Sequence, residues 1–172
     1  MTQLIAFDGH TPVVDPTAFV APSATIIGQA SLGADSSAFY GVVVRADTAA
    51  ISVGRGTNLQ DNVVLHADPD FPTTVGNGVS VGHGAVVHGC TVEDDCLIGM
   101  GATIMNGAVI GAGSLVAGGA VILEGSIIPP GSLVAGVPAK VRRELGPEEL
   151  ENVRLNASHY VELARKHKAI HG

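Results

Sequence analysis

The chain has 172 residues, which is enough for one domain with a sizeable core. Aromatic residues make up only 3% of it, Trp is absent and Gly occurs 23 times, so the core must be built from small aliphatic side chains. The formal net charge is −7 and the Lys and Arg residues do not cluster. This charge pattern argues against nucleic acid or an anionic membrane surface as a partner.

The N-terminal residues lack the basic start and the long apolar run of a signal peptide. No stretch approaches the length of uninterrupted apolar sequence that a transmembrane helix needs. The two cysteines, Cys90 and Cys96, do not make a disulfide framework and are expected to be reduced packing residues. We therefore expect a cytoplasmic protein.

In chain order, the first predicted elements are short strands, because apolar residues recur every six positions in three phased series. These series are Val14, Val20, Ile26, Leu32, Ala38 and Val44, then Val53, Leu59 and Leu65, and then Val75, Val81 and Val87. The last two series are separated by an insertion that contains Asp68-Pro69-Asp70-Phe71-Pro72. Its two prolines predict a loop that leaves the repeat.

The next predicted elements form an unbroken six-residue repeat. Its apolar positions are Val92, Ile98, Ile104, Ile110, Val116, Ile122, Ile128 and Val134, and from Ile98 to Ile128 each is followed three residues later by Gly. A six-residue unit is a short strand with a tight corner, and Gly supplies the positive φ that such a corner often needs. No unit buries its apolar residue alone, so the units must stack into a parallel β-helix.

After Ala135-Gly136-Val137-Pro138-Ala139-Lys140 the repeat stops, and residues 146–170 are predicted to form a helix, with Pro147 and acidic residues in its first turn. Residues 1–140 are then the β-helix, and the helix packs along its outside. Uninterrupted hexads with this closing motif resemble the left-handed parallel β-helix proteins. The resemblance implies an all-β, single-stranded left-handed parallel β-helix with a C-terminal α-helix, three hexads to each triangular coil, and a trimer.

Three histidines lie inside the repeat with the spacing H-x16-H-x4-H. His66 and His88 both follow the apolar residue of a hexad, and three hexads, or one coil, separate them, so their rings should stack in one column. His83 belongs to an earlier hexad and should lie near another corner. For the remaining histidines, His10, His159, His167 and His171, we expect ordinary surface roles.

One chain therefore offers two converging imidazoles, and a threefold assembly would add His83 of a neighbouring chain. Three neutral imidazoles with an open position are typical of catalytic zinc, although Co²⁺ or Fe²⁺ also suits them. Zinc lowers the pKa of a bound water to about 7, which makes hydroxide available to attack a carbon such as that of CO₂. The alternative is that these are unrelated polar residues on a solvated β-helix face.

Three stretches resemble the signature sequences of the γ-class carbonic anhydrases: GVVVRAD at 41–47, NLQDNVVLH at 58–66 and VGHGAVVHG at 81–89. The resemblance covers the chain from about Val14 to the final helix. It implies reversible hydration of CO₂ to bicarbonate by a homotrimer that shares the metal between adjacent subunits. It also implies that Gln60 lies near the metal-bound water as a hydrogen-bonding group.

Further site residues are expected around the interface. By hexad count, Arg45 lies one coil below His66, and across a subunit boundary it could face Asp61 of the neighbour. A purely structural salt bridge is the alternative for Arg45, Asp47 and Asp61. Asn58 is expected to help orient the site. Asn156 and Tyr160 are four residues apart on one helix face, which the resemblance places near the metal; simple packing is the alternative.

The match weakens at the loop after His66, which is short and holds only Asp68 and Asp70 as acids. The archaeal enzyme that defines the class has a longer acidic loop tied to proton export. Two other functions therefore stay open. One is a hexapeptide acyltransferase or related enzyme acting on CoA thioesters, with a histidine as general base. The other is a catalytically weak metal-binding scaffold.

Overall fold

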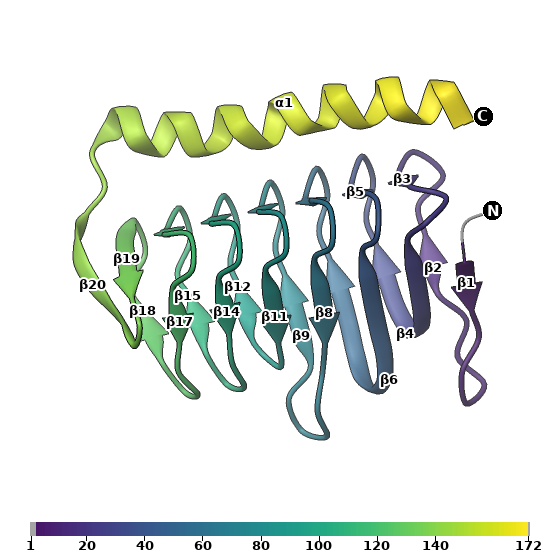
Figure 1. The fold of residues 1–172 in the computed structure, drawn as a ribbon, viewed down its shortest axis with the longest axis horizontal. Coiled ribbons are helices and arrows are strands. Elements are labelled where there is room, and N and C mark those ends of the chain that lie inside the picture. The colour runs from purple at the N-terminus through teal and green to yellow at the C-terminus, as the bar shows by residue number, and fades with distance from the viewer. Residues whose placement is uncertain (1–2, 172) are drawn as a thin grey trace.

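A computed structural model describes residues 3–171, in which the chain winds into a coil of short strands with one helix running along its length (Figure 1). The helix is α1 (Pro147–His171). The strands are β1 (Gln3–Ile5), β2 (Val13–Val14), β3 (Phe19–Val20), β4 (Thr25–Leu32), β5 (Ser37–Ala38), β6 (Val43–Val53), β7 (Asn58–Leu59), β8 (Val64–His66), β9 (Thr73–Val75), β10 (Ser80–Val81), β11 (Val86–His88), β12 (Thr91–Val92), β13 (Leu97–Ile98), β14 (Thr103–Ile104), β15 (Val109–Ile110), β16 (Leu115–Val116), β17 (Val121–Ile122), β18 (Ile127–Ile128), β19 (Ser132–Gly136) and β20 (Ala139–Glu144).

Parallel ladders connect equivalent strands of successive coils and define three faces. The first face is β8-β11-β14-β17, the second is β9-β12-β15-β18, and the third is β3-β5-β7-β10-β13-β16-β19. Strand β6 turns the corner between the first two faces, because its start pairs with β8 and its end pairs with β9. Each strand in the interior of a ladder is hydrogen-bonded to the coil before and after it, which fixes the register of its outward side chains.

The predicted six-residue positions are the core. Seven of the eight residues from Val92 to Val134 are at most 1% exposed, and Ile128 is 7% exposed. Removing such a side chain from water contributes about 1.5–3 kcal/mol, so the stack of branched aliphatics is the main stabilising element of the coil. Corner glycines such as Gly101 have positive φ, as predicted, and Asn62 and Asp95 adopt the same conformation where Gly is absent. The predicted left-handed parallel β-helix with a C-terminal helix is confirmed.

The insertion after His66 forms the predicted loop, which projects from the coil between β8 and β9 (Figure 1). It is closed by a bridge between Asp68 and Phe71. The Thr73 hydroxyl donates to the His66 carbonyl at 2.6 Å and accepts from the Gly89 amide at 2.8 Å. These bonds hold the loop against the two strands that carry His66 and His88.

Helix α1 begins one residue later than expected and ends at the last described residue. The Gly146 amide donates to the Glu149 carboxylate at 2.9 Å, which satisfies one of the free donors at the start of the helix. Val153, Ala157 and Ala164 face the coil and are buried. Ahead of the helix, β20 turns back antiparallel to β19 and extends past residue 140, the expected end of the repeat.

Cys90 and Cys96 are free and buried, which confirms their predicted packing role. Burial raises the pKa of each thiol to about 12. Among residues 3–171, no helix combines the length and the apolar character that crossing a bilayer requires.

Candidate metal centre

His66 and His88 stack in one column, as the hexad count predicted. They are direct partners in the β8–β11 ladder, and Arg45 of β6 is the partner of His66 on the other side. The two imidazole rings have centroids 4.8 Å apart, and Nδ1 of His66 lies 2.8 Å from Nε2 of His88. Leu65 and Val87, which precede the two histidines in their strands, are fully buried. Because side chains alternate along a strand, His66 and His88 point outward from the coil.

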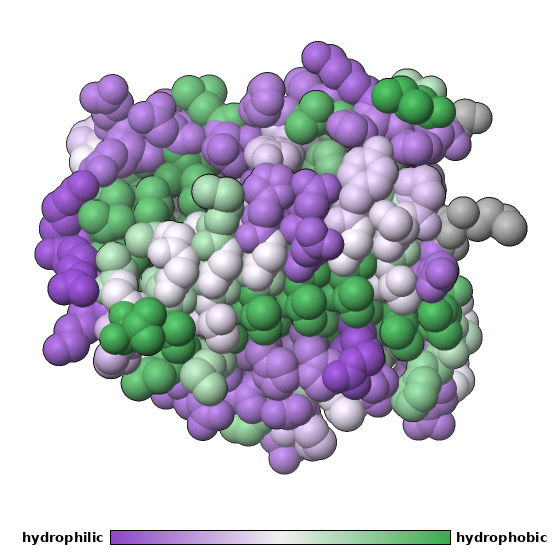
Figure 2. All heavy atoms as spheres, viewed as in Figure 1, coloured by the Kyte–Doolittle hydropathy of each residue, from purple (hydrophilic) through white to green (hydrophobic). Residues whose placement is uncertain are grey.

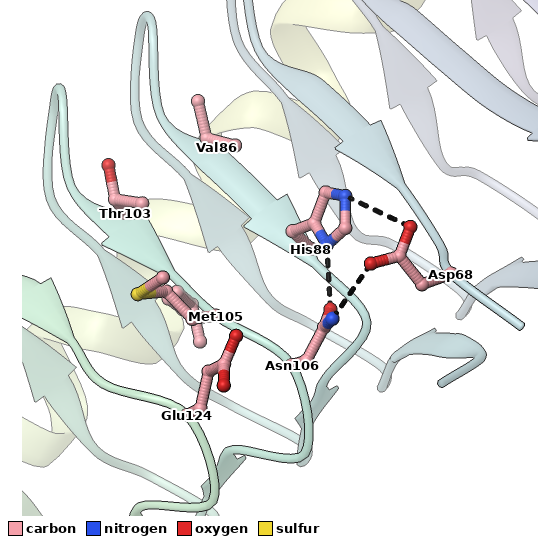
Figure 3. A pocket seen from close by; sticks show the side chains of 8 residues that line it. Asp68, Val86, His88, Thr103, Met105, Asn106 and Glu124 are labelled. Carbon is pink, nitrogen blue, oxygen red and sulfur yellow. Dashed lines mark hydrogen bonds and ion pairs between the residues drawn. The ribbon is translucent and has the colours of Figure 1, made fainter. Parts of the chain in front are cut away.

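Each histidine is oriented by a partner on its other nitrogen. Nε2 of His66 lies 3.1 Å from Asp47 Oδ1, and Nδ1 of His88 lies 2.7 Å from Asn106 Oδ1. Figure 3 shows that Asn106 is itself fixed, because its amide donates to Asp68 Oδ2 at 2.8 Å. An oxygen partner requires an N–H on the facing nitrogen, so in neutral rings these contacts favour a proton on Nε2 of His66 and on Nδ1 of His88.

In those tautomers the inner nitrogens, 2.8 Å apart, present lone pairs to each other unless a proton lies between them in a hydrogen bond. Two facing lone pairs repel, whereas a cation between them would accept both. Histidines that donate their outer N–H to an oxygen while presenting the inner nitrogen are the usual ligands of protein metal sites. The donor chemistry of the pair therefore fits a metal ion.

Asp68 adds a third donor that the sequence prediction did not include among the ligands. Its Oδ1 is 4.0 Å from Nε2 of His88, and single donor atoms of His66, Asp68 and His88 all lie within 4.8 Å of one another. We call these three residues with Asp47 and Asn106 the histidine-pair half-site. Asp68 comes from the inserted loop and Asn106 from the turn after β14, and hexad periodicity says nothing about where such side chains turn.

The half-site opens into a concavity next to His88 (Figure 3). Its wall consists of Asp68, Val86, His88, Thr103, Ile104, Met105, Asn106 and Glu124. The floor is therefore partly apolar, while carboxylates of Asp68 and Glu124 stand at its edges.

Within the chain, Arg45 pairs with Asp47 at 2.5 Å rather than with Asp61. Burial raises the pKa of Asp47, but hydrogen bonds from Arg45 and His66 outweigh it and hold that pKa below its ordinary value. Asp47 therefore stays ionised and can keep accepting the His66 N–H. The structure places Arg45 and Asp47 at the histidine pair, so a contact of Arg45 with Asp61 of a neighbour stays a prediction.

His83 lies at a different corner, as predicted, and its Nδ1 is 2.9 Å from Asp61 Oδ2. It lines a second concavity with Gln60, Met100, Asn156 and Tyr160. We call His83, Asp61, Gln60, Asn156 and Tyr160 the His83 half-site. The single chain thus brings helix α1 and the coil together around His83, and it keeps His83 apart from the histidine pair.

Gln60 is held by a buried polar chain. Its amide donates to Asn58 Oδ1 at 3.1 Å, and the Asn58 amide donates to Ser80 Oγ at 2.9 Å. Gln60 is 7% exposed, so these bonds fix the direction of its remaining amide atoms. Asn58 is accordingly an orienting residue within the chain, and Ser80 was missed because a small polar residue has no sequence signal of its own.

Helix α1 supplies two side chains to the His83 half-site. Oδ1 of Asn156 is buried and accepts no hydrogen bond from any described residue. Burial and the negative charge of Asp61 raise the pKa of Tyr160, so its phenol remains a hydrogen-bond donor at neutral pH. A buried acceptor without a donor is costly, which favours a donor from outside the chain at this point.

The chain resembles curated proteins over most of its length. It is 53% identical over 145 residues to a protein of Methanocaldococcus jannaschii named probable carbonic anhydrase, covering 84% of this chain and 91% of that one. It is 44% identical over 172 residues to the mitochondrial γ carbonic anhydrase 2 of Arabidopsis thaliana. That match covers 96% of this chain but only 62% of the plant protein.

Among solved structures, a hexapeptide transferase family protein from Anaplasma phagocytophilum superposes with a TM-score of 0.92 and 40% identity, covering 95% of this chain and 97% of that one. No protein-family model matches the sequence. The high coverage of the Methanocaldococcus protein, together with the coil and the stacked histidines, decides the assignment. The chain belongs to the γ-class carbonic anhydrase family.

Proposed function

We propose that this protein catalyses the metal-dependent, reversible hydration of CO₂ to bicarbonate. The observation that carries the proposal is the convergence of Nδ1 of His66 and Nε2 of His88, which lie 2.8 Å apart while Asp47 and Asn106 hold the outer nitrogens. Ordinary surface histidines rarely have both outer nitrogens fixed by oxygen partners. The names of the relatives support the same reaction.

His66 and His88 would hold the metal together with His83 of a neighbouring copy in a homotrimer. The face that carries the histidine pair supports such a contact, because Val43, Val64 and Val86 form an outward column of half-buried side chains on it. Figure 2 shows hydrophobic residues gathered in a band across the coil. A neighbour that covered the valines would also bring a His83 half-site to the histidine pair.

When bound, the metal would supply the Lewis acidity that lowers the pKa of a coordinated water to about 7. Zn²⁺ is the proposed ion, and Co²⁺ or Fe²⁺ would suit the same imidazoles. Val86 offers CO₂ an apolar wall next to His88. The Gln60 amide, fixed by Asn58, would hydrogen-bond the oxygen atoms of substrate or bicarbonate from the facing half-site.

Turnover also needs a route for the proton to bulk solvent. Asp68 is committed to Asn106, but the exposed Glu124 carboxylate lines the same concavity without such a contact (Figure 3). Glu124 would accept the proton and release it to buffer. An acid from the β17–β18 turn would then serve in place of a long acidic loop.

The second candidate is transfer of an acyl group from a CoA thioester, which the transferase-family name of the Anaplasma structure favours. In that reaction one histidine would act as general base, and the convergence of His66 and His88 would not be required. A metal-binding scaffold with little activity is the third outcome.

Metal analysis of the purified protein, followed by CO₂ hydration assays with and without a chelator, separates these functions. We expect stoichiometric metal and a hydration rate that the chelator abolishes and added Zn²⁺ restores. Absence of stoichiometric metal would overturn the proposal. Metal without hydration would favour the scaffold, and chelator-resistant acyl transfer would favour the second candidate.

A cytoplasmic location stays a prediction, since the Arabidopsis relative carries a mitochondrial name.

A further inference from the structure

The end of helix α1 carries a second convergence of metal-ligating groups, far along the chain from the histidine pair. His167 and His171 are four residues apart, so they share one helix face. Nδ1 of His167 lies 2.9 Å from the Tyr40 hydroxyl, and Nε2 of His171 lies 3.0 Å from the same oxygen. His167 is half-buried and His171 is exposed, and the expectation of ordinary surface roles did not include this shared contact with Tyr40.

Aromatic packing holds the three rings in place. Phe19 and Phe39 are 3% and 4% exposed, and the ring of His167 lies 5.8 Å and 5.5 Å from theirs. The ring of His171 stacks on Phe19 with an interplanar angle of 12°. The nitrogens that face Tyr40 are therefore set by packing against the core, which reduces the entropy lost when a ligand binds.

The donor set indicates which metals would suit this cluster. The Tyr40 oxygen lies 2.9 Å from Nδ1 of His167 and 3.0 Å from Nε2 of His171, so the three donor atoms already converge. Two imidazole nitrogens and a phenolic oxygen are N and O ligands, which Cu²⁺ and Ni²⁺ accept.

We propose that Tyr40, His167 and His171 form a second metal site for a divalent ion that accepts N and O ligands, such as Cu²⁺ or Ni²⁺, with the phenolic proton of Tyr40 released to solvent on binding. Of the neighbouring cations, Arg165 pairs with Asp35, whereas Lys168 donates to the neutral carbonyls of Pro16 and Ala18 and keeps its positive charge, which opposes a bound cation. The site joins the last turn of α1 to the turn after β5. Its occupancy would therefore fasten the helix to the first coils.

The proposal does not depend on carbonic anhydrase activity and is tested apart from it. Cu²⁺ is titrated into the His66→Ala/His88→Ala variant, which lacks the histidine pair. We expect one Cu²⁺ per chain, a visible phenolate-to-Cu²⁺ charge-transfer band and a higher melting temperature with the metal bound.

Matched variants identify the ligands. In the same background, His167→Asn or His171→Asn should weaken Cu²⁺ binding by more than about tenfold. Tyr40→Phe should remove the charge-transfer band while keeping the aromatic ring. His159→Asn, an exposed histidine on the same helix, should change nothing. If the background variant does not fold, wild-type protein should bind two Cu²⁺ per chain and His167→Asn only one. Absence of the band, or equal binding in the ligand variants and the control, overturns the proposal.

Discussion

The two half-sites of this chain are built in different ways. The histidine-pair half-site lies on successive coils of one face, so the repeat itself stacks His66 on His88. The His83 half-site combines one corner of the coil with the side chains of Asn156 and Tyr160 from α1, which follow His83 by more than 70 residues in the sequence. The first depends on local register, whereas the second depends on where the helix docks.

This difference has a consequence for assembly. The histidine pair offers two imidazoles whose inner nitrogens have no oxygen partner within hydrogen-bonding distance among residues 3–171, while His83 stands alone beside Asp61. The histidine pair would provide two imidazole ligands and the His83 half-site the third, so two copies of the chain would complete one metal centre.

Replacing His88 should have the largest effect. His88→Ala removes one of the two facing nitrogens, and we expect at least about a 100-fold loss of metal affinity and loss of CO₂ hydration. The coil should stay folded because the side chain points outward. Metal content and circular dichroism check this, with the exposed His10→Ala as control. Loss of the circular dichroism signal of the β-helix together with the metal would mean that His88 is structural.

Mixing two inactive variants tests whether the metal is shared between subunits. His83→Ala and His88→Ala chains, unfolded and reassembled together, should recover intact sites at about a quarter of the interfaces of a random trimer. Each recovered site would take the histidine pair from one chain and His83 from the next. Metal content and hydration rate are measured against each variant alone. No recovery on mixing would place all ligands within one chain.

Removing an orienting group should weaken the histidine pair without destroying it. Asn106→Ala frees the ring of His88 and leaves Asp68 without its partner, so metal affinity should fall by about 10- to 100-fold. Competition with a chromogenic chelator measures this change. Glu124→Gln, in the same concavity, is the matched control and should leave metal affinity unchanged. Equal affinities in both variants would argue against orientation by Asn106.

Glu124→Gln should instead slow proton export. We expect turnover to fall by up to about tenfold in dilute buffer and to recover as buffer concentration rises, because small bases then carry the proton. Stopped-flow hydration at several buffer concentrations checks this. Asp70→Gln, on the inserted loop, is the control. A rate deficit that buffer does not relieve would give Glu124 a different role.

The smallest effect should come from the start of α1, on which only the His83 half-site depends. Hydrogen bonds from Arg143 and from the Gly146 amide lower the pKa of Glu149 to about 2. The stability that Glu149 contributes is therefore complete above its ordinary pKa of about 4.5 and is lost as pH falls through about 2. Glu149→Gln should lower the melting temperature by a few degrees at pH 7 and by almost nothing near pH 2.

Thermal melts of Glu149→Gln and wild-type protein over this pH range check the sign. Glu148→Gln is the control, since Glu148 is exposed and lies in the same first turn of the helix. A difference that grows as pH falls would contradict the assignment. The histidine pair should keep its metal affinity in both variants, because β8 and β11 do not contact α1 through Glu149.

Much of the candidate site could be predicted from the sequence, because the number of hexads between two residues gives their relative position in the coil. The column that holds Arg45, His66 and His88 follows directly from hexad number, and so does the separation of His83. Asp68 and Asn106 could not be placed in this way, because one lies on an inserted loop and the other in a turn. Their side-chain directions depend on contacts that periodicity does not encode.

By itself, the sequence determined the coil, its inward aliphatics, its corners and the stacking of His66 on His88. A strict six-residue period leaves one register in which every branched residue is buried. The oxygen partners of the histidine pair, the enclosure of Gln60 and the convergence of His167 and His171 on Tyr40 could be found only in the folded chain. Those features join segments distant in the chain, and they arise from the docking of a loop and a helix, which no repeat specifies.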